Sequence, residues 1–172
     1  MQIGYVMMTE RGEADALLTQ VAARLMQRGV RLAGLVQTNQ PRPNTHHCDM
    51  DVRVLPEGPV LRISQNLGAA TRGCRLDPAA LEDAVGHIDA ALDAAPHCLI
   101  LNKFGKHEAE GRGLRPVIAK ALLMDIPVVV GVNALNREAF AAFADGYAQP
   151  LAATRDTVEH WVMERIGQMA EA

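Results

Sequence analysis

The sequence predicts an α/β fold in which a mostly parallel sheet is flanked by helices and carries a peripheral β-hairpin. Three observations lead to this prediction. Short runs that are apolar at every position alternate with longer stretches in which apolar residues recur at helical spacing. Wholly apolar strands are typical of a parallel sheet that is buried on both faces. Between residues 49 and 64, by contrast, two β-like runs flank a short turn, which predicts a hairpin.

The first strand, helix and strand form a predicted βαβ unit. Ile3–Met8 is an apolar strand candidate, and a turn at Thr9–Gly12 follows it. A helix is predicted over about Glu13–Arg28, because its leucines and valine recur at helical spacing and Gly29 supplies a stop. Leu32–Val36 is the second strand candidate.

The middle of the chain contains the predicted hairpin. Thr38–Thr45 is expected to be a loop, because Pro41 and Pro43 oppose regular structure. Asp49–Leu55 and Val60–Ser64 are the two short strands, and a turn with two prolines and a glycine joins them. This hairpin is expected to lie at the periphery of the parallel sheet.

The second half of the chain returns to alternating helices and strands. Asp77 is a good N-cap and Pro78 a good first residue for a helix that extends to Ala95. The remaining predictions are a strand at Cys98–Leu101, a helix at about Gly113–Met124, a strand at Val128–Val132, and helices at Asn136–Ala144 and Thr154–Met169.

Length and composition predict one α/β domain over residues 1–172. Hydrophobic residues make up 49% and charged residues 22%, as in ordinary globular proteins. Aromatic residues, at 3%, are too scarce for base-stacking platforms, and a net charge of −3 gives no attraction to nucleic acid or anionic membranes. There is no apolar run of membrane-spanning length or secretion-signal pattern, so we expect no nucleic-acid or membrane partner.

A concentration of polar residues after the strand at Cys98–Leu101 indicates a site. Polar and charged side chains there include Asn102, Lys103, Lys106 and Glu108. Two of the three lysines in the chain lie in this stretch. Because ligands of open α/β sheets bind just beyond the carboxyl ends of strands, this loop is the expected binding region.

The basic residues of this region favour a small anionic ligand. We expect binding by a set of seven residues: Asn102, Lys103, Lys106, Glu108, Arg112, Arg72 and Arg75. The two last-named arginines would reach the strand ends if the irregular segment Gln65–Leu76 folds over them. An arginine fork suits phosphate and other tetrahedral oxyanions. The alternative is that acidic neighbours, namely Glu108, Glu110 and Asp77, neutralise these cations in surface ion pairs.

Metal and thiol chemistry receive less support. The run His46, His47, Cys48, Asp49 and Asp51 contains metal-ligand residue types, but it lacks an established ligand spacing, and we predict no metal site. The three cysteines are expected to be free thiols, as in the cytoplasm. Cys98 should be buried in its strand, whereas Cys74, between two arginines, should be the more reactive thiol.

The order of elements resembles that of P-loop nucleoside-triphosphatases, whose phosphate cradle lies between the first strand and the first helix. The usual pattern of that cradle is G-x-x-x-x-G-K-[ST]. Here the matching stretch, residues 8–16, has one glycine, no lysine and three acidic residues. The stretch Asn102-Lys-Phe-Gly-Lys-His-Glu108 is similar to a motif of small enzymes of this class. Gly105, Lys106 and Glu108 match, but Asn102 and Lys103 replace its two acidic residues. The resemblance therefore implies the fold without the usual catalytic groups.

The chain also resembles, over nearly its whole length, the bacterial proteins grouped as domain of unknown function 2478. The resemblance rests on five segments in the right order: Gly34-Leu-Val-Gln37, Cys48-Asp-Met-Asp51, Arg62-Ile-Ser-Gln65, Arg72-Gly-Cys-Arg-Leu-Asp77 and the stretch from Asn102 to Arg112. No activity is established for that family. Its members occur beside molybdate-transport genes, so the resemblance implies a connection with molybdate.

Three functions follow from these observations. The leading one is a binding protein for a nucleotide, phosphate or another small oxyanion. The second is a phosphotransfer or hydrolase enzyme with a site rebuilt around Lys103, Lys106 and Glu108. The third is a regulatory or protein-interaction module. The sequence specifies no cofactor.

Overall fold

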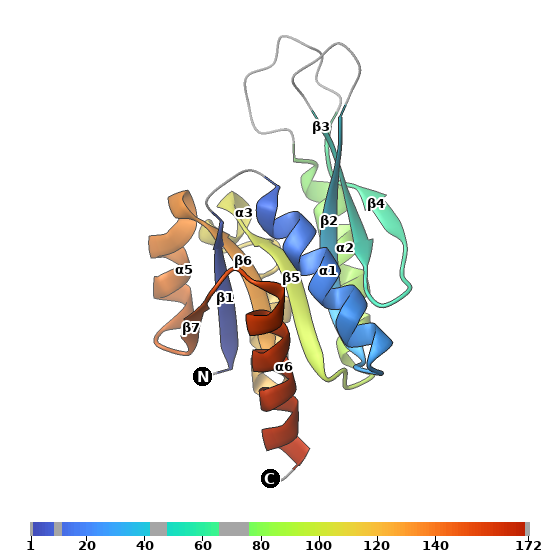
Figure 1. Cartoon of the computed structure of the whole chain (residues 1–172). Coiled ribbons are helices and arrows are strands. Elements are labelled where there is room, and N and C mark those ends of the chain that lie inside the picture. The colour runs from blue at the N-terminus through green and yellow to red at the C-terminus, as the bar shows by residue number, and fades with distance from the viewer. Residues whose placement is uncertain (1, 9–11, 42–47, 66–75, 171–172) are drawn as a thin grey trace.

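Seven strands form one sheet in the order β4-β3-β2-β5-β6-β1-β7 (Figure 1). The structure is a computed structural model that describes residues 2–8, 12–41, 48–65 and 76–170. The strands are β1 (Ile3–Met8), β2 (Leu32–Pro41), β3 (Cys48–Val54), β4 (Val60–Arg62), β5 (Cys98–Phe104), β6 (Val128–Asn133) and β7 (Ala148–Leu151).

Five of these strands pair in parallel, and the other two add an antiparallel hairpin at one edge. β1 lies between β6 and β7, β5 lies between β6 and β2, and all four of these pairings are parallel. β3 pairs antiparallel with both β2 and β4. The predicted α/β architecture, with its mostly parallel sheet and peripheral hairpin, is therefore confirmed and is consistent with a P-loop NTPase-like fold.

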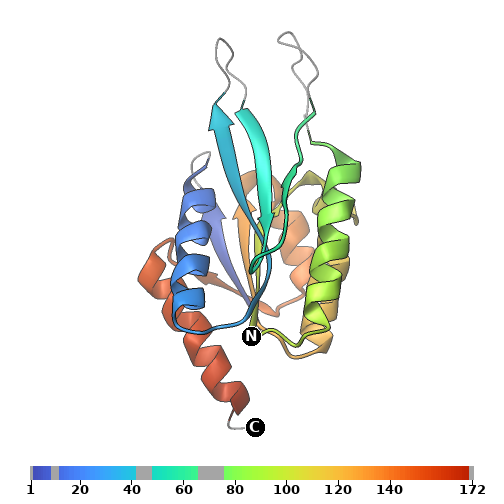
Figure 2. The same ribbon diagram turned by 90° about the vertical axis from the view of Figure 1, so that its right-hand side faces the viewer.

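Helices cover both faces of the sheet (Figure 2). One face carries α1 (Glu13–Gln27) and α6 (Arg155–Ala170). The other face carries α2 (Pro78–Leu92), α4 (Arg115–Leu123) and α5 (Arg137–Ala144). Two shorter elements, α3 (Lys106–Ala109) and the 3₁₀ turn η1 (Ala134–Asn136), follow the carboxyl ends of β5 and β6.

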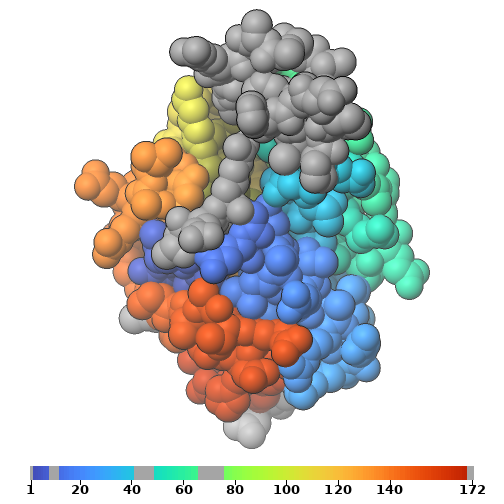
Figure 3. Space-filling view, turned by 45° about the horizontal axis from the view of Figure 1, so that its top comes forward, coloured from blue at the N-terminus to red at the C-terminus, as the bar shows by residue number. Residues whose placement is uncertain are grey.

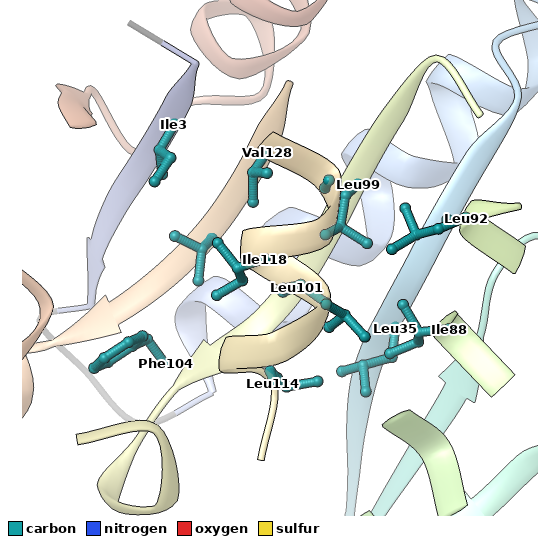
Figure 4. Close-up of a cluster of buried hydrophobic side chains, with 14 of the residues drawn as sticks. Ile3, Leu35, Ile88, Leu92, Leu99, Leu101, Phe104, Leu114, Ile118 and Val128 are labelled. Carbon is teal, nitrogen blue, oxygen red and sulfur yellow. The ribbon is translucent and has the colours of Figure 1, made fainter. Parts of the chain in front are cut away.

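The sheet separates two apolar clusters, as a parallel sheet covered on both sides requires. Alternate residues of β5 point to opposite faces, so Leu99 and Leu101 belong to one cluster while Cys98 and Ile100 belong to the other. Figure 4 shows the first cluster, in which side chains of α2 and α4 pack on Leu35, Leu99 and Leu101. This packing fixes the strand ends from which the polar loops leave.

The carboxyl ends of the parallel strands lie at one edge of the sheet, at the top of Figure 1. There the pairing of β5 with β6 is irregular between Leu101 and Phe104, and the Asn102–Lys103 peptide bond is cis. Figure 3 brings this edge forward and shows the yellow segment that carries α3 beside the orange α5. The loop that the sequence singled out thus lies where ligands of α/β sheets bind.

Two sequence predictions at the hairpin and the C-terminal half are wrong. Residues 38–41 were expected in a loop, but β2 extends to Pro41 because it continues to pair with β3 up to Cys48. Pro41 is tolerated because it is the last residue of the strand. The strand β7 was not predicted, because Ala148–Leu151 is short and contains a proline; it lies at the sheet edge.

The helix boundaries differ from the predictions by a few residues, for backbone reasons. α2 ends at Leu92 rather than Ala95, and Ala95 has a left-handed φ of 47°. α4 begins at Arg115 rather than Gly113, whose φ of 61° lies outside the helical region. Asp77 is the N-cap of α2 as predicted, since its carboxylate accepts from the amides of Ala79 (3.0 Å) and Ala80 (3.3 Å).

Candidate ligand-binding site

A cavity of about 490 Å³ lies at the carboxyl edge of the sheet, on the face covered by α2 and α4. Its wall is apolar and is built by β2, β3, α2 and the start of α4; it includes Leu35, Val52, Ile63, Leu81 and Leu114. Its rim is polar and comes from the carboxyl ends of β5 and β6 and from the turns that follow them: Asn102, Lys103, Lys106, His107, Asn133 and Asn136. β5 extends to Phe104, past its predicted end at Leu101. The volume falls in the range of about 300–1,000 Å³ that is usual for small-molecule sites.

Four of the seven predicted site residues line this cavity, namely Asn102, Lys103, Lys106 and Glu108. β5 supplies the first two, and the short helix α3 supplies the other two. Arg112 lies in the same loop but is absent from the cavity lining. Arg72 and Arg75 lie outside the described residues, so the expected contribution of the segment 66–75 stays a prediction.

Lys106 and Arg112 share one acidic partner, Glu110. The Lys106 Nζ lies 3.7 Å from the Glu110 Oε1, and the Arg112 guanidinium donates a hydrogen bond to the Glu110 Oε2. That hydrogen bond, with the nearby Lys106 charge, lowers the pKa of the Glu110 carboxyl. All three side chains are exposed, so these ion pairs contribute little to stability. Among the described residues, Glu110 is the acidic side chain with which an anion at Lys106 must compete.

Glu108 has a different environment, because its side chain is buried. Its Oε2 accepts a hydrogen bond from the Gly105 amide at 2.8 Å, and its Oε1 accepts one from the Leu114 amide at 3.0 Å. The carboxylate therefore caps α3 and also binds the amide just before α4. Of the acidic residues considered as partners for the lysines, only Glu110 takes that role among the described residues; Glu108 binds backbone amides and Asp77 caps α2.

Asn102 connects the cavity to the first turn of α1. Its Nδ2 donates a hydrogen bond to the Asp15 Oδ1 at 2.6 Å. The other oxygen of this buried carboxylate accepts from the Asn39 side chain, and the Gln37 Nε2 donates to the Asn39 Oδ1 at 2.8 Å. Side chains from α1, β2 and β5 thus form one partly buried polar network at the strand ends.

This network lies where a P-loop protein would hold phosphate, between β1 and α1. A carboxylate there carries the wrong charge to bind a phosphate group. The first turn of α1 also places Glu13 and Ala14 directly after Gly12, where the usual pattern has lysine and serine or threonine. The sequence lacks the usual phosphate-binding residues of the cradle, and the side chains described next to it do not favour phosphate either.

One acceptor in the network has no partner among the residues that the structure describes. The Asn102 Oδ1 is buried and accepts no hydrogen bond from any residue that the structure describes. Buried carbonyl oxygens in native proteins are usually satisfied by a donor or a water molecule. The side chain that joins the network to the cavity is thus also the one with hydrogen-bonding capacity left.

Sequence reasoning missed most of this network. Asp15 was considered only as an acidic residue that opposes phosphate, and Asn39 was placed in a loop. The signal that could have found them is the run of amide side chains, Gln37 and Asn39, at the end of a strand next to the Asn102 strand. Side chains at the carboxyl ends of adjacent parallel strands meet at one edge.

The acidic residues of the hairpin form ion pairs with Arg62. Arg62 on β4 contacts the Asp49 Oδ2 at 2.9 Å and the Asp51 Oδ1 at 2.9 Å. The hydrogen bond with Asp51 raises the pKa of the Arg62 guanidinium. Within the described ranges, no cluster of three or more His, Cys, Asp or Glu side chains could hold a metal ion. His46 and His47 lie outside those ranges.

The cysteine predictions can be checked at one position. Cys98 is a free, fully buried thiol in β5, and burial raises its pKa. This confirms that it packs as a small apolar residue. Cys74, which was expected to be the more reactive thiol, lies outside the described residues.

Comparison with known proteins identifies the family. Residues 3–161 match the model of a family described as "Protein of unknown function (DUF2478)". The chain belongs to this family. It is also 31% identical, over 168 residues, to the "Molybdenum import ATP-binding protein ModC 2" of Bradyrhizobium diazoefficiens (strain JCM 10833 / BCRC 13528 / IAM 13628 / NBRC 14792 / USDA 110).

The two proteins differ greatly in length. The match covers 98% of this chain but 19% of the relative, so the chain spans less than one fifth of the protein that it matches. No solved structure matches the chain significantly. Among the described helices, none has the length and apolar character needed to cross a membrane.

Proposed function

We propose that this protein binds a small anionic ligand, such as a nucleotide, phosphate or another oxyanion, in the cavity at the carboxyl edge of the sheet, and that it does so without hydrolysing nucleotide. The observation that carries the proposal is that Lys103 and Lys106, two of the three lysines of the chain, line the rim of this cavity. In open α/β sheets this edge is the usual place for ligands.

The charge distribution around the cavity supports the proposal. Lys106 is exposed, and the acidic partner seen near it, Glu110, is an exposed side chain on a flexible stem. An incoming oxyanion would replace that weak pair with a direct charge-assisted contact. Glu108, the other acidic residue at the rim, is occupied by the amides of Gly105 and Leu114 and does not compete for the lysines.

Molybdate is one of the oxyanions to test. The relative that matches this chain is named as a molybdenum import ATP-binding protein. Molybdate, sulfate and phosphate are all tetrahedral oxyanions, so one cationic rim could accept any of them.

The experiment is a calorimetric titration of phosphate, sulfate, molybdate, AMP and ATP into wild type and three variants. Lys106→Ala should weaken binding by about tenfold or more, since a hydrogen bond to a charged group contributes about 1.5–3 kcal/mol. Glu110→Gln should strengthen binding, because it removes the carboxylate that competes for Lys106 and Arg112. Lys120→Ala is the matched control, because that lysine pairs with Asp89 and Asp93 on α2 and is absent from the cavity lining.

The proposal would be contradicted if the wild-type protein bound none of the five ligands at millimolar concentration. A millimolar dissociation constant corresponds to a binding free energy of ~4 kcal/mol. Equal losses of ligand affinity in Lys106→Ala and Lys120→Ala would contradict the proposal as well. In that case the protein-interaction function leads, and the length of the relative favours it: a segment of this kind accounts for 19% of a much longer ATP-binding protein.

A turnover assay separates binding from enzyme function. We expect no magnesium-dependent release of phosphate from ATP or GTP, because the turn before α1 lacks the phosphate-binding lysine and Asn102 and Lys103 stand where acidic residues would handle magnesium. Hydrolysis that Lys106→Ala abolishes would instead establish the rebuilt enzyme site.

A further inference from the structure

We infer that the ligand of the cavity is an organic anion with an apolar body rather than a bare tetrahedral oxyanion. This inference rests on the proposed function, because it names the chemical class of ligand for the same cavity. The geometry pairs two cationic side chains at the rim with an apolar wall that no inorganic anion could use.

The wall is the first observation. Leu35, Val52 and Ile63 come from β2 and the hairpin, and Leu81 and Leu114 come from α2 and the start of α4. The same residues continue the buried apolar cluster beneath them, except for Leu81. A bare oxyanion is fully hydrated in water and gains nothing from an apolar surface, whereas a ring or alkyl group gains about 25 cal/mol for each Å² that it buries.

The space is the second observation. At about 490 Å³ the cavity is several times larger than one tetrahedral oxyanion requires, and it fits the size class of organic ligands. Lys103 and Lys106 come from the end of β5 and the start of α3, while the leucines of the lining come from other elements. A ligand with an anionic group at one end and an apolar body at the other matches this division.

An exposed leucine at the rim is the third observation. Leu135 on η1 lines the cavity, yet 94% of its surface is exposed. The backbone of η1 is held by Asn133, whose Oδ1 accepts from the Asn136 amide at 3.0 Å, so the leucine is presented on an ordered turn. An apolar ligand body in the cavity would cover part of this side chain.

The cavity is also separate from the position of the phosphate cradle. Its lining includes no described residue of α1, and the buried carboxylate of Asp15 lies beyond Asn102. The ligand would therefore use the face of the sheet that carries α2 and α4. This differs from the placement expected if the degenerate cradle still held a nucleotide.

The test compares four probes: inorganic phosphate, ribose 5-phosphate, AMP and 1-naphthyl phosphate. All carry a phosphate group, but only the last two carry a flat aromatic ring system that can pack on the apolar wall. We expect at least one of these two to bind wild type tenfold or more tightly than phosphate and ribose 5-phosphate. Leu135→Ala should weaken that binding about threefold to tenfold, in line with the partial loss of a buried leucine, and should weaken phosphate binding by a smaller factor.

The control is Leu123→Ala. Leu123 ends α4 at the end of the helix away from the cavity and is 87% exposed, so it matches Leu135 in type and exposure. Neither substitution should alter the fold. Equal affinity for all four probes, or equal effects of the two leucine substitutions, overturns the inference and leaves the anion site intact. Failure of all four probes to bind removes the proposed function as well.

Discussion

Glu108 and Glu110 lie two positions apart in one loop but have opposite environments. Glu108 is 3% exposed, and its carboxylate accepts hydrogen bonds from two backbone amides. The Glu110 side chain, in contrast, is exposed and forms ion pairs with Lys106 and Arg112. A Cβ atom at Gly113 would lie 2.2 Å from the Glu108 Oε1, so glycine there leaves room for the carboxylate. Glu108 therefore stabilises the backbone conformation of the loop, whereas Glu110 partly neutralises the positive charge of Lys106 and Arg112.

Glu108→Ala should destabilise the protein by about 2–6 kcal/mol, because one buried and one partly buried amide lose their acceptor at about 1–3 kcal/mol each. Glu110→Ala, in the same loop, should leave the denaturation midpoint almost unchanged. Chemical denaturation of both variants measures the difference. Similar midpoints for the two would show that the Glu108 contacts contribute nothing beyond those of a surface glutamate.

At the residue scale, the sequence located the lysines but not their surroundings. Lys103 and Lys106 were identifiable because they follow an apolar strand directly, which is a local pattern. The hydrogen bond from Asn102 to Asp15 joins residues 87 positions apart, so only the packing of α1 against the sheet creates it. Glu110 pairs with Lys106 because the two residues have i,i+4 spacing. Glu108 does not, because its carboxylate binds the amides of Gly105 and Leu114.

Three elements meet at Asp15: the helix α1 and the ends of β2 and β5. The carboxylate is 6% exposed and accepts from Asn102 and Asn39, so its charge is stabilised by two amides without a described cationic partner. This connection holds the start of α1 to the strand ends. It would be disturbed by any second negative charge.

Asn102→Asp restores an acidic residue at the end of β5 but should destabilise the protein. Two buried carboxylates within hydrogen-bond distance raise each other's pKa, so one must be protonated in the folded state. A carboxyl group whose pKa is higher in the folded than in the unfolded protein does not destabilise the fold at pH values below its unfolded pKa. It destabilises the fold increasingly as the pH rises above that value. The loss should therefore be small near pH 4, about the unfolded pKa of an aspartate, and larger, about 2–4 kcal/mol, near pH 8.

The double variant Asp15→Asn with Asn102→Asp is the matched control. It restores one carboxylate and one amide across the same contact, so it should recover most of the stability lost at pH 8. Thermal unfolding at the two pH values gives the comparison. No recovery in the double variant would mean that the Asp15 contact is not what Asn102→Asp disrupts.

The ends of helices and strands could be predicted from the sequence where nearby residues determine them. They could not be predicted where pairing with a distant strand determines them. The start of α2 follows from Asp77 and Pro78, and β1 coincides with its apolar run. The extension of β2 to Pro41 depends on antiparallel partners in β3. The short helix α3 follows from the carboxylate of Glu108 bound to the Gly105 amide, which no periodicity indicates.

The whole sheet joins the parallel strands and the hairpin through one strand. β2 pairs with β5 over Leu32–Leu35 and with β3 from Leu35 onward, so it belongs to both parts. The apolar cluster on the α2 side likewise includes Val52 and Ile63 from the hairpin region as well as Leu99 and Val128 from the parallel strands. The alternation of apolar runs and helices predicted a parallel sheet, but the order of strands follows from packing that no local pattern records.

This continuity predicts that the protein unfolds in one cooperative step, in accord with the single domain expected from the sequence. Trp161, the one tryptophan of the chain, is buried in the cluster on the α1 and α6 side and reports that face by fluorescence. Amide hydrogen exchange at Val52 and Val129 reports the hairpin and the centre of the sheet. Because β2 and the shared cluster couple all three probes, they should give the same free energy of unfolding. Exchange at Val52 through an opening well below the global value, with Val129 and Trp161 unaffected, would show that the hairpin is a separate cooperative unit.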